Sequence, residues 1–148
     1  MITIYTIGFT KKDARRFFEL LKKAKIEKLI DIRVNNSSQL AGFAKGEDLK
    51  YFCKTILDSE YIHIPDLAPT KELLKSYTNK ETTWIQYEKI FTKLLQERMV
   101  LKKYDINIFN NSCLLCSEDT PEYCHRRLVA EYLKKEHPEQ DVKIIHLV

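Results

Sequence analysis

Glycine and proline are scarce in this chain of 148 residues, which contains only three glycines and four prolines. So few residues of these types argue against long flexible linkers, and the sequence shows no internal repeat and no low-complexity tract. A chain of this length is large enough to bury one hydrophobic core. We therefore expect residues 1–148 to form a single domain.

Long apolar runs are absent as well. No stretch approaches the roughly 18 uncharged apolar residues that a membrane-spanning helix needs. The first residues lack the basic start and the apolar segment of a secretion signal, and charged residues begin at Lys11. These absences predict a cytoplasmic protein with no membrane contact. The four cysteines would stay reduced in that compartment, so a disulfide framework is not expected.

The net charge of +4 is spread unevenly along the chain. Residues 11–28 carry eight lysines and arginines against three acidic residues. A helix in this segment would present Arg15, Arg16, Lys22 and Lys23, which could contact the phosphates of a nucleic acid. A solvated basic helix face is the simpler alternative. Few exposed aromatic residues are expected beside these positions, which argues against a platform that stacks single-stranded bases.

Short apolar or β-branched segments alternate with segments of helical periodicity. Strands are predicted at residues 2–7, 29–32, 61–64, 113–116 and 142–146. Such alternation predicts an α/β fold with a mostly parallel central sheet of about five strands and helices on both faces, in three layers.

Three local patterns predict where helices begin. Thr10 is expected to cap the first helix, and Thr83 with Gln86 forms a capping-box pair. Thr120 followed by Pro121 predicts the start of the last helix, with proline at the first helical position.

Polar residues follow four of the predicted strands, at residues 8–10, 31–38, 63–70 and 116–126. Ligands of parallel α/β sheets bind beyond the carboxyl ends of the strands. We therefore expect these four stretches to meet at one edge of the sheet and to form a site.

The stretch 116–126 leads from a strand end into a helix N-terminus, where free amides and the helix dipole favour anions and lower thiol pKa values. Cys116, Cys124 and His125 are therefore candidate catalytic residues, with a thiol as nucleophile or redox group and His125 as general base. Arg126 is predicted to bind an anion. In the competing interpretation both cysteines are buried packing residues and His125 is a hydrogen-bonded core histidine.

Further candidates for anion binding follow the second and third strands. Arg33 could hold a phosphate, sulfate or carboxylate in bidentate fashion, oriented by Asp31, or the two could form only a local ion pair. Ser38 could add a hydroxyl donor. His63 could line the site or be an internally bonded histidine.

A zinc site formed by Cys116, Cys124 and His125, with His63 as fourth ligand, is an alternative, but the spacing matches no standard zinc pattern. Cys113 and Cys116 lie three apart in a strand, about 10 Å from each other and on opposite faces, so they should not share a metal. Cys53 lies in an apolar helical stripe and is expected to be structural. No metal or cofactor is predicted.

Several short motifs, in this order, resemble the family known as domain of unknown function 488, over nearly the whole chain. They are Tyr5-Thr6-Ile7-Gly8, Asp31-Ile32-Arg33, Tyr61-Ile62-His63-Ile64-Pro65-Asp66-Leu67, and Leu114-Leu115-Cys116-x-Glu118 followed by Cys124-His125-Arg126-Arg127. The resemblance implies one shared site made of Asp31, Arg33, His63, Cys116, Glu118, Cys124, His125 and Arg126. It implies no particular reaction.

The chain departs from the family pattern at three positions. Phe9 stands where many relatives have histidine, Asn36 where proline is usual, and Gln39 where arginine is common. If Phe9 and Gln39 replace site residues, this branch would have a different ligand or a weaker site.

These observations favour an enzyme with a thiol and arginine site for a phosphoryl, sulfuryl or nucleotide-like ligand, such as a cysteine-dependent transferase or hydrolase. A non-catalytic module for nucleotides or nucleic acid is the second hypothesis, and a zinc protein the third.

Overall fold

The computed structural model describes residues 1–37 and 42–148. Its centre is a five-stranded sheet, in which every pair of neighbouring strands is parallel. The strands are β1 (Ile2–Gly8), β2 (Lys28–Asp31), β3 (Glu60–His63), β4 (Ser112–Cys116) and β5 (Val142–Leu147), in the order β3-β2-β4-β1-β5. The predicted parallel α/β sheet is confirmed.

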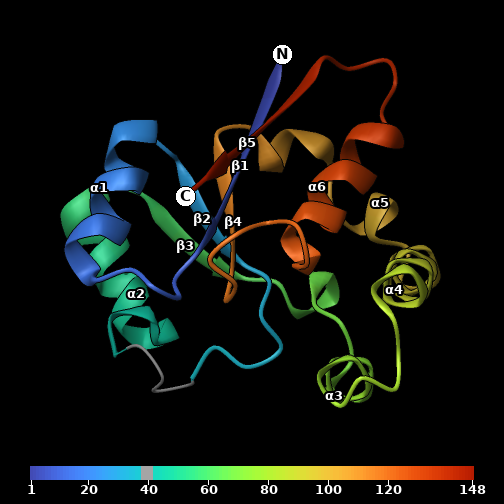
Figure 1. Cartoon of the computed structure of the whole chain (residues 1–148). Coiled ribbons are helices and arrows are strands. Elements are labelled where there is room, and N and C mark those ends of the chain that lie inside the picture. Colours follow the sequence, from blue (N-terminus) through green and yellow to red (C-terminus); the bar gives the residue numbers. More distant parts are fainter. Residues whose placement is uncertain (38–41) are drawn as a thin grey trace.

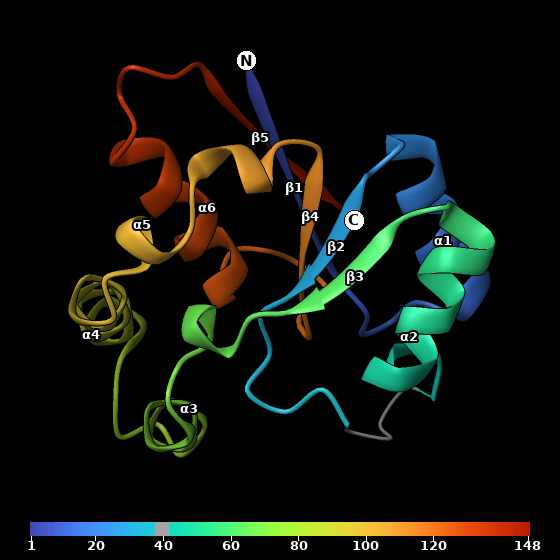
Figure 2. The same ribbon diagram turned by 180° about the vertical axis from the view of Figure 1, so that it is seen from behind.

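Helices cover both faces of this sheet. They are α1 (Ala14–Ala24), α2 (Gly46–Phe52), α3 (Lys71–Thr78), α4 (Trp84–Glu97), α5 (Val100–Lys103) and α6 (His125–Lys135). Shorter helical turns occupy Gly42–Ala44, Cys53–Leu57, Pro65–Leu67 and Ile106–Phe109. Helices α1 and α2 lie on one side of the sheet and α3 to α6 on the other, which gives three layers (Figures 1 and 2). None of the described helices has the length and apolar character needed to cross a membrane.

The two faces of the sheet contribute to two separate cores. Ile4 and Leu114 pack in the core beneath α4 and α6, whereas Ile7, Cys113 and Leu115 pack in the core beneath α1. Successive side chains of a strand point to opposite faces, so a strand covered on both sides must be apolar throughout. All five residues of β4 are buried and four of them are apolar, while the hydroxyl of the fifth, Ser112, donates to the Phe109 carbonyl.

Two of the three predicted helix starts are wrong. Asp13, rather than Thr10, caps α1 by accepting a hydrogen bond from the Arg16 amide, and the Thr10 hydroxyl instead donates to the carbonyl of Ser117. Helix α6 begins at His125 with Cys124 as its N-cap, so residues 120–123 form a turn before the helix. The capping box of Thr83 and Gln86 at the start of α4 is confirmed.

The strand register brings distant parts of the chain together at the carboxyl edge of the sheet. Gly8 at the end of β1 lies beside Cys116 at the end of β4, and Asp31 at the end of β2 lies beside His63 at the end of β3. The loops that follow these strands therefore start from one edge.

Candidate functional site

Cys116, Cys124 and His125 form a buried cluster at this edge. Cys116 ends β4, Cys124 is the N-cap of α6, and His125 is the first residue of that helix. Their two sulfurs and a ring nitrogen all lie within 4.8 Å of one another, and the Cys116 sulfur is 3.3 Å from Nδ1 of His125. The structure thus brings together the three residues proposed as catalytic.

The orientation of His125 is fixed by a backbone group. Its Nε2 lies 2.7 Å from the carbonyl oxygen of Ile32, just beyond β2. Since a carbonyl only accepts, Nε2 carries a proton and donates it. The Cys116 sulfur lies 3.3 Å from Nδ1 and 3.6 Å from Nε2, so it sits beside both ring nitrogens. The ring also packs edge-on against Phe91, with 5.6 Å between centroids.

The two clustered thiols differ in acidity. Burial raises the pKa of Cys116 well above the ordinary thiol value, and its hydrogen bond to Cys124 adds to the effect. Burial also acts to raise the pKa of Cys124, but hydrogen bonds with Cys116 and His125, together with the positive charge of Arg126, hold that pKa well below the ordinary value. These surroundings favour the thiolate at Cys124 over the thiolate at Cys116.

The other two cysteines lie outside the cluster, in the core beneath α1. Burial raises the pKa of Cys53 to about 12 and raises that of Cys113 as well. Both are uncharged packing residues, as predicted for Cys53.

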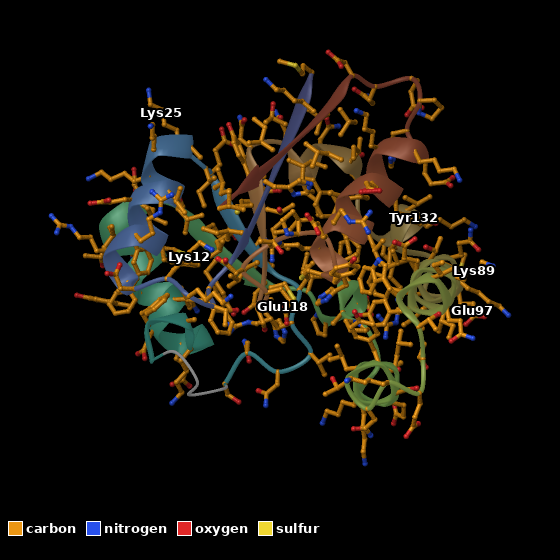
Figure 3. The ribbon with its side chains drawn as sticks, in the orientation of Figure 1. Lys12, Lys25, Lys89, Glu97, Glu118 and Tyr132 are labelled. Atoms are coloured by element: carbon orange, nitrogen blue, oxygen red, sulfur yellow. The ribbon has the colours of Figure 1, made fainter. Side chains whose placement is uncertain are left out.

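A cavity of about 840 Å³ opens over the cluster. Cys116, Cys124 and His125 line one part of it, and the residues after β2, helix α3, the start of α4 and the loop after β4 supply the rest. Glu118, in the loop after β4, also lines the cavity and is exposed (Figure 3).

Four aromatic residues form a second wall of the cavity: Tyr77, Trp84, Tyr87 and Tyr123. Trp84 and Tyr87 stack with centroids 4.8 Å apart, while Tyr77 and Tyr123 meet Trp84 edge-on at 5.4 and 5.6 Å. The indole nitrogen of Trp84 is buried and has no hydrogen-bond partner. Trp84 and Tyr87 lie at helical spacing on one face of α4, and such spacing in a sequence gives no indication that the face borders a cavity.

Asp31 and Arg33 form a buried bidentate ion pair. The Asp31 carboxylate accepts from Nε of Arg33 at 2.8 Å and from its NH2 at 2.6 Å, and the Tyr61 hydroxyl donates to it at 2.5 Å. Arg33 also donates to the Ala44 carbonyl, but its NH1 has no partner among residues 1–37 and 42–148. Arg33 lines the cavity, and the ring of Phe9 lies 5.3 Å from its guanidinium carbon.

His63 is close to this pair but is not part of the cavity lining. Its Nε2 lies 2.8 Å from the carbonyl oxygen of Arg33, so its ring supports the backbone after β2. Ser38 and Gln39 lie outside the described residues.

Arg126 is fully buried and directs its donors to the protein itself. NH1 donates to the Glu118 carbonyl, NH2 to the Asp119 carbonyl at 3.3 Å, and Nε to the Thr6 hydroxyl at 3.3 Å. Arg126 therefore holds the loop that follows β4, and it is not among the residues that line the cavity.

The same loop is held from its other side by the segment after β1. The Thr10 amide donates to the Ser117 carbonyl at 3.0 Å, and the Lys12 ammonium donates to the Asp119 carboxylate at 3.0 Å. The side chain of Lys12 is 3% exposed, so it packs against the protein where it contacts the loop (Figure 3).

The basic residues of α1 lie on the other side of the sheet from the cavity (Figures 1 and 2). Arg15, Arg16, Lys22 and Lys23 are all exposed. Arg15 pairs with Glu19 at 3.3 Å, and Arg16 donates to the carbonyl of Val148 at 2.8 Å. A nucleic acid bound at this face would not contact the thiol cluster.

Comparison with known proteins identifies the family. Neither the curated proteins nor the solved structures compared with this chain include a match. The model of the family described as domain of unknown function DUF488 matches residues 13–133, a range that includes β2, β3, β4 and the thiol cluster. The chain therefore belongs to the DUF488 family.

Proposed function

We propose that the protein is a cysteine-dependent transferase or hydrolase, with Cys124 as its nucleophile. One observation carries this proposal: a thiol at a helix N-cap, hydrogen-bonded to a second thiol and next to an oriented histidine, borders a cavity of about 840 Å³. A thiolate is the nucleophilic form of cysteine, and such surroundings stabilise it.

The reaction would use His125 as the proton carrier. The proton that Cys124 loses in forming its thiolate is held at Nδ1 of His125, and the sulfur attacks the phosphoryl, sulfuryl or acyl centre of the substrate. A bond from sulfur to that centre forms, the bond to the leaving group breaks, and the leaving group takes the proton from His125. Water or an acceptor hydroxyl then gives its proton to Nδ1 and displaces the sulfur, which restores the thiolate.

The cavity lining supports a ligand that combines an anionic group with a planar ring. Lys71 and Lys80 line the cavity, and so does Arg33, whose NH1 has no partner. Cationic groups of this kind bind phosphate, sulfate or carboxylate. The aromatic wall of Tyr77, Trp84, Tyr87 and Tyr123 suits a ring such as a nucleobase. Arg126 acts by positioning the loop, because its own donors are already bonded.

Alkylation should distinguish Cys124 from the other cysteines. In reduced, chelator-treated protein we expect iodoacetamide to modify Cys124 roughly tenfold faster or more than Cys53 and Cys113, because Cys124 borders the cavity as a stabilised thiolate. Peptide mass spectrometry over time measures the three rates.

Two variants complete this test. Cys124→Ala should remove the fast modification and any turnover of aryl phosphate, aryl sulfate or thioester substrates, whereas Cys53→Ala should retain both. Slow labelling of Cys124 at the rate of Cys53 and Cys113 would contradict the proposed nucleophile.

Binding of nucleic acid by α1 is a second candidate function, favoured by the exposure of four basic residues on one helix. The affinity for an oligonucleotide should then fall with salt by a slope of about 0.7–0.9 per phosphate contacted. Lys22→Glu with Lys23→Glu should abolish it without changing the alkylation of Cys124. Absence of binding at low salt would eliminate this candidate.

A further inference from the structure

We infer that Cys116, Cys124 and His125 also form a binding site for a soft divalent metal ion, Zn²⁺, with the fourth coordination position open to the cavity. This inference does not rest on the proposed reaction, because it depends on the positions of three ligand atoms and not on any substrate.

The spacing of the ligand atoms is close to that of a tetrahedral site. Zinc lies about 2.3 Å from cysteine sulfur and about 2.0 Å from histidine nitrogen, which places ligand atoms roughly 3.5–3.8 Å from each other. The Cys116 sulfur and Nδ1 of His125 are already 3.3 Å apart, and all three atoms lie within 4.8 Å. Side-chain rotations that move the two sulfur atoms by about one ångström or less would bring the three ligand atoms to the spacing of a tetrahedral zinc site.

His125 is arranged as a metal-binding histidine usually is. Histidine ligands almost always donate their second ring N–H to a carbonyl, a carboxylate or water, which fixes the tautomer and directs the other nitrogen at the metal. Nε2 of His125 makes this bond to the Ile32 carbonyl at 2.7 Å, which leaves Nδ1 for the metal. The Cys116 sulfur lies 3.3 Å from Nδ1 and 3.6 Å from Nε2, so the ring must turn for Nδ1 to point at the ion.

The donor set selects the metal and its coordination. Two thiolates and an imidazole suit zinc and exclude hard ions such as Mg²⁺ and Ca²⁺, which prefer oxygen. His63, expected from the sequence as a fourth ligand, is not in the cluster, and its Nε2 is engaged by the Arg33 carbonyl. The protein thus supplies three ligands, and the cavity side is left for water or a bound ligand, as in catalytic zinc sites.

Metal loading should lower thiol reactivity. A zinc ion bound to the Cys124 sulfur withdraws electron density from the thiolate and restricts access to it, so an alkylating agent or a substrate meets a weaker nucleophile. Zinc would therefore act as a reversible inhibitor of the thiol chemistry. The cluster would exist in two states, one with zinc bound and one with a reactive thiol.

Cobalt spectroscopy tests the site directly. Reduced full-length protein, stripped with a chelator, should bind one equivalent of Co²⁺ with sulfur-to-cobalt charge-transfer absorption and the intense visible bands of tetrahedral cobalt. One equivalent of Zn²⁺ should displace it. Cys116→Ser and Cys124→Ser should each weaken Zn²⁺ binding roughly 100-fold or more. Removal of a group that only hydrogen-bonds to a metal ligand already lowers metal affinity about 10–100-fold, and these variants remove a ligand itself. Cys53→Ala, in the other core, should bind as wild type does.

Wild-type protein alone provides a second readout in case the variants fail to fold. One equivalent of Zn²⁺ should protect Cys124 from iodoacetamide, and a chelator should restore labelling. Folded, reduced wild type that binds no stoichiometric Co²⁺ or Zn²⁺, or cysteine variants that bind as tightly as wild type, would overturn the inference. Fast labelling of Cys124 that Zn²⁺ does not affect would overturn the metal site and leave the proposed nucleophile standing.

Discussion

Asp31→Ala is expected to lower the free energy of unfolding by about 3–5 kcal/mol, the usual result of leaving a buried charge without its partner. Asp31 is 0% exposed and Arg33 is 4% exposed, so water cannot replace the lost carboxylate. The variant removes both acceptors of the bidentate pair and the acceptor of the Tyr61 hydroxyl. NH1 of Arg33 has no partner in the part of the chain that the structure describes, so within that part the bond to the Ala44 carbonyl is the one that would remain for its guanidinium.

Urea unfolding of wild type and variant measures this loss. Glu19→Ala is the matched control, because it breaks the exposed pair of Arg15 and Glu19 and should cost less than about 1 kcal/mol. Adding Arg33→Met to Asp31→Ala should recover part of the stability, since replacing both members of a buried pair by apolar groups is often neutral. An unchanged urea midpoint for Asp31→Ala would show that the buried ion pair of Asp31 and Arg33 does not stabilise the fold.

The strands were predictable because each is a short segment rich in apolar or β-branched residues, and the central strands β2 and β4 are buried on both faces of the sheet. Residues 29–32, 61–64 and 113–116 were each predicted within one residue of the observed β2, β3 and β4. Burial on both faces leaves a continuous apolar run in the sequence, and such a run depends little on distant contacts.

The start of α6 could not be predicted in the same way. Thr120 and Pro121 form a good local pattern for a helix start. However, Arg126 binds the carbonyls of Glu118 and Asp119, and Thr10 and Lys12 hold the loop from the other side. These contacts join residues far apart in the chain, and they hold the loop so that the helix begins only after the turn at residues 120–123.

The candidate site was predictable where it depends on the order of strands and helices, but not where it depends on how distant elements pack. The strand-end rule indicated that Cys116, Cys124 and His125 would meet, because it depends only on the order of strands and helices. The aromatic wall depends on how α3 and α4 pack. The sequence of an apolar helix face has the same periodicity whether the face covers a sheet or borders a cavity. The burial of Arg126 was equally hidden, since arginine is usually exposed and only its partners, the loop carbonyls and Thr6, explain its position.

Gly8→Ala tests whether the loop after β4 sets the geometry of the thiols. A Cβ at this position would lie 1.6 Å from the Glu118 carbonyl oxygen and 2.8 Å from NH1 of Arg126. Gly8 has no positive φ, so the glycine is required here for space and not for its backbone conformation. The added methyl must therefore push the loop away from β1 and break the contact of Arg126 with Glu118.

Because that loop joins Cys116 to Cys124, we expect Gly8→Ala to slow the alkylation of Cys124 roughly tenfold or more, and to cost about 1–3 kcal/mol of stability as other overpacked sites do. The same time course by mass spectrometry, with urea unfolding beside it, gives both values. Gly42→Ala is the control, since its added Cβ has no atom within 4 Å and should change neither. If Cys124 in folded Gly8→Ala is alkylated at the wild-type rate, the loop does not set the reactivity of this thiol. The reactivity would then come from α6 alone, without a contribution from the contacts of β1 and Arg126 with the loop.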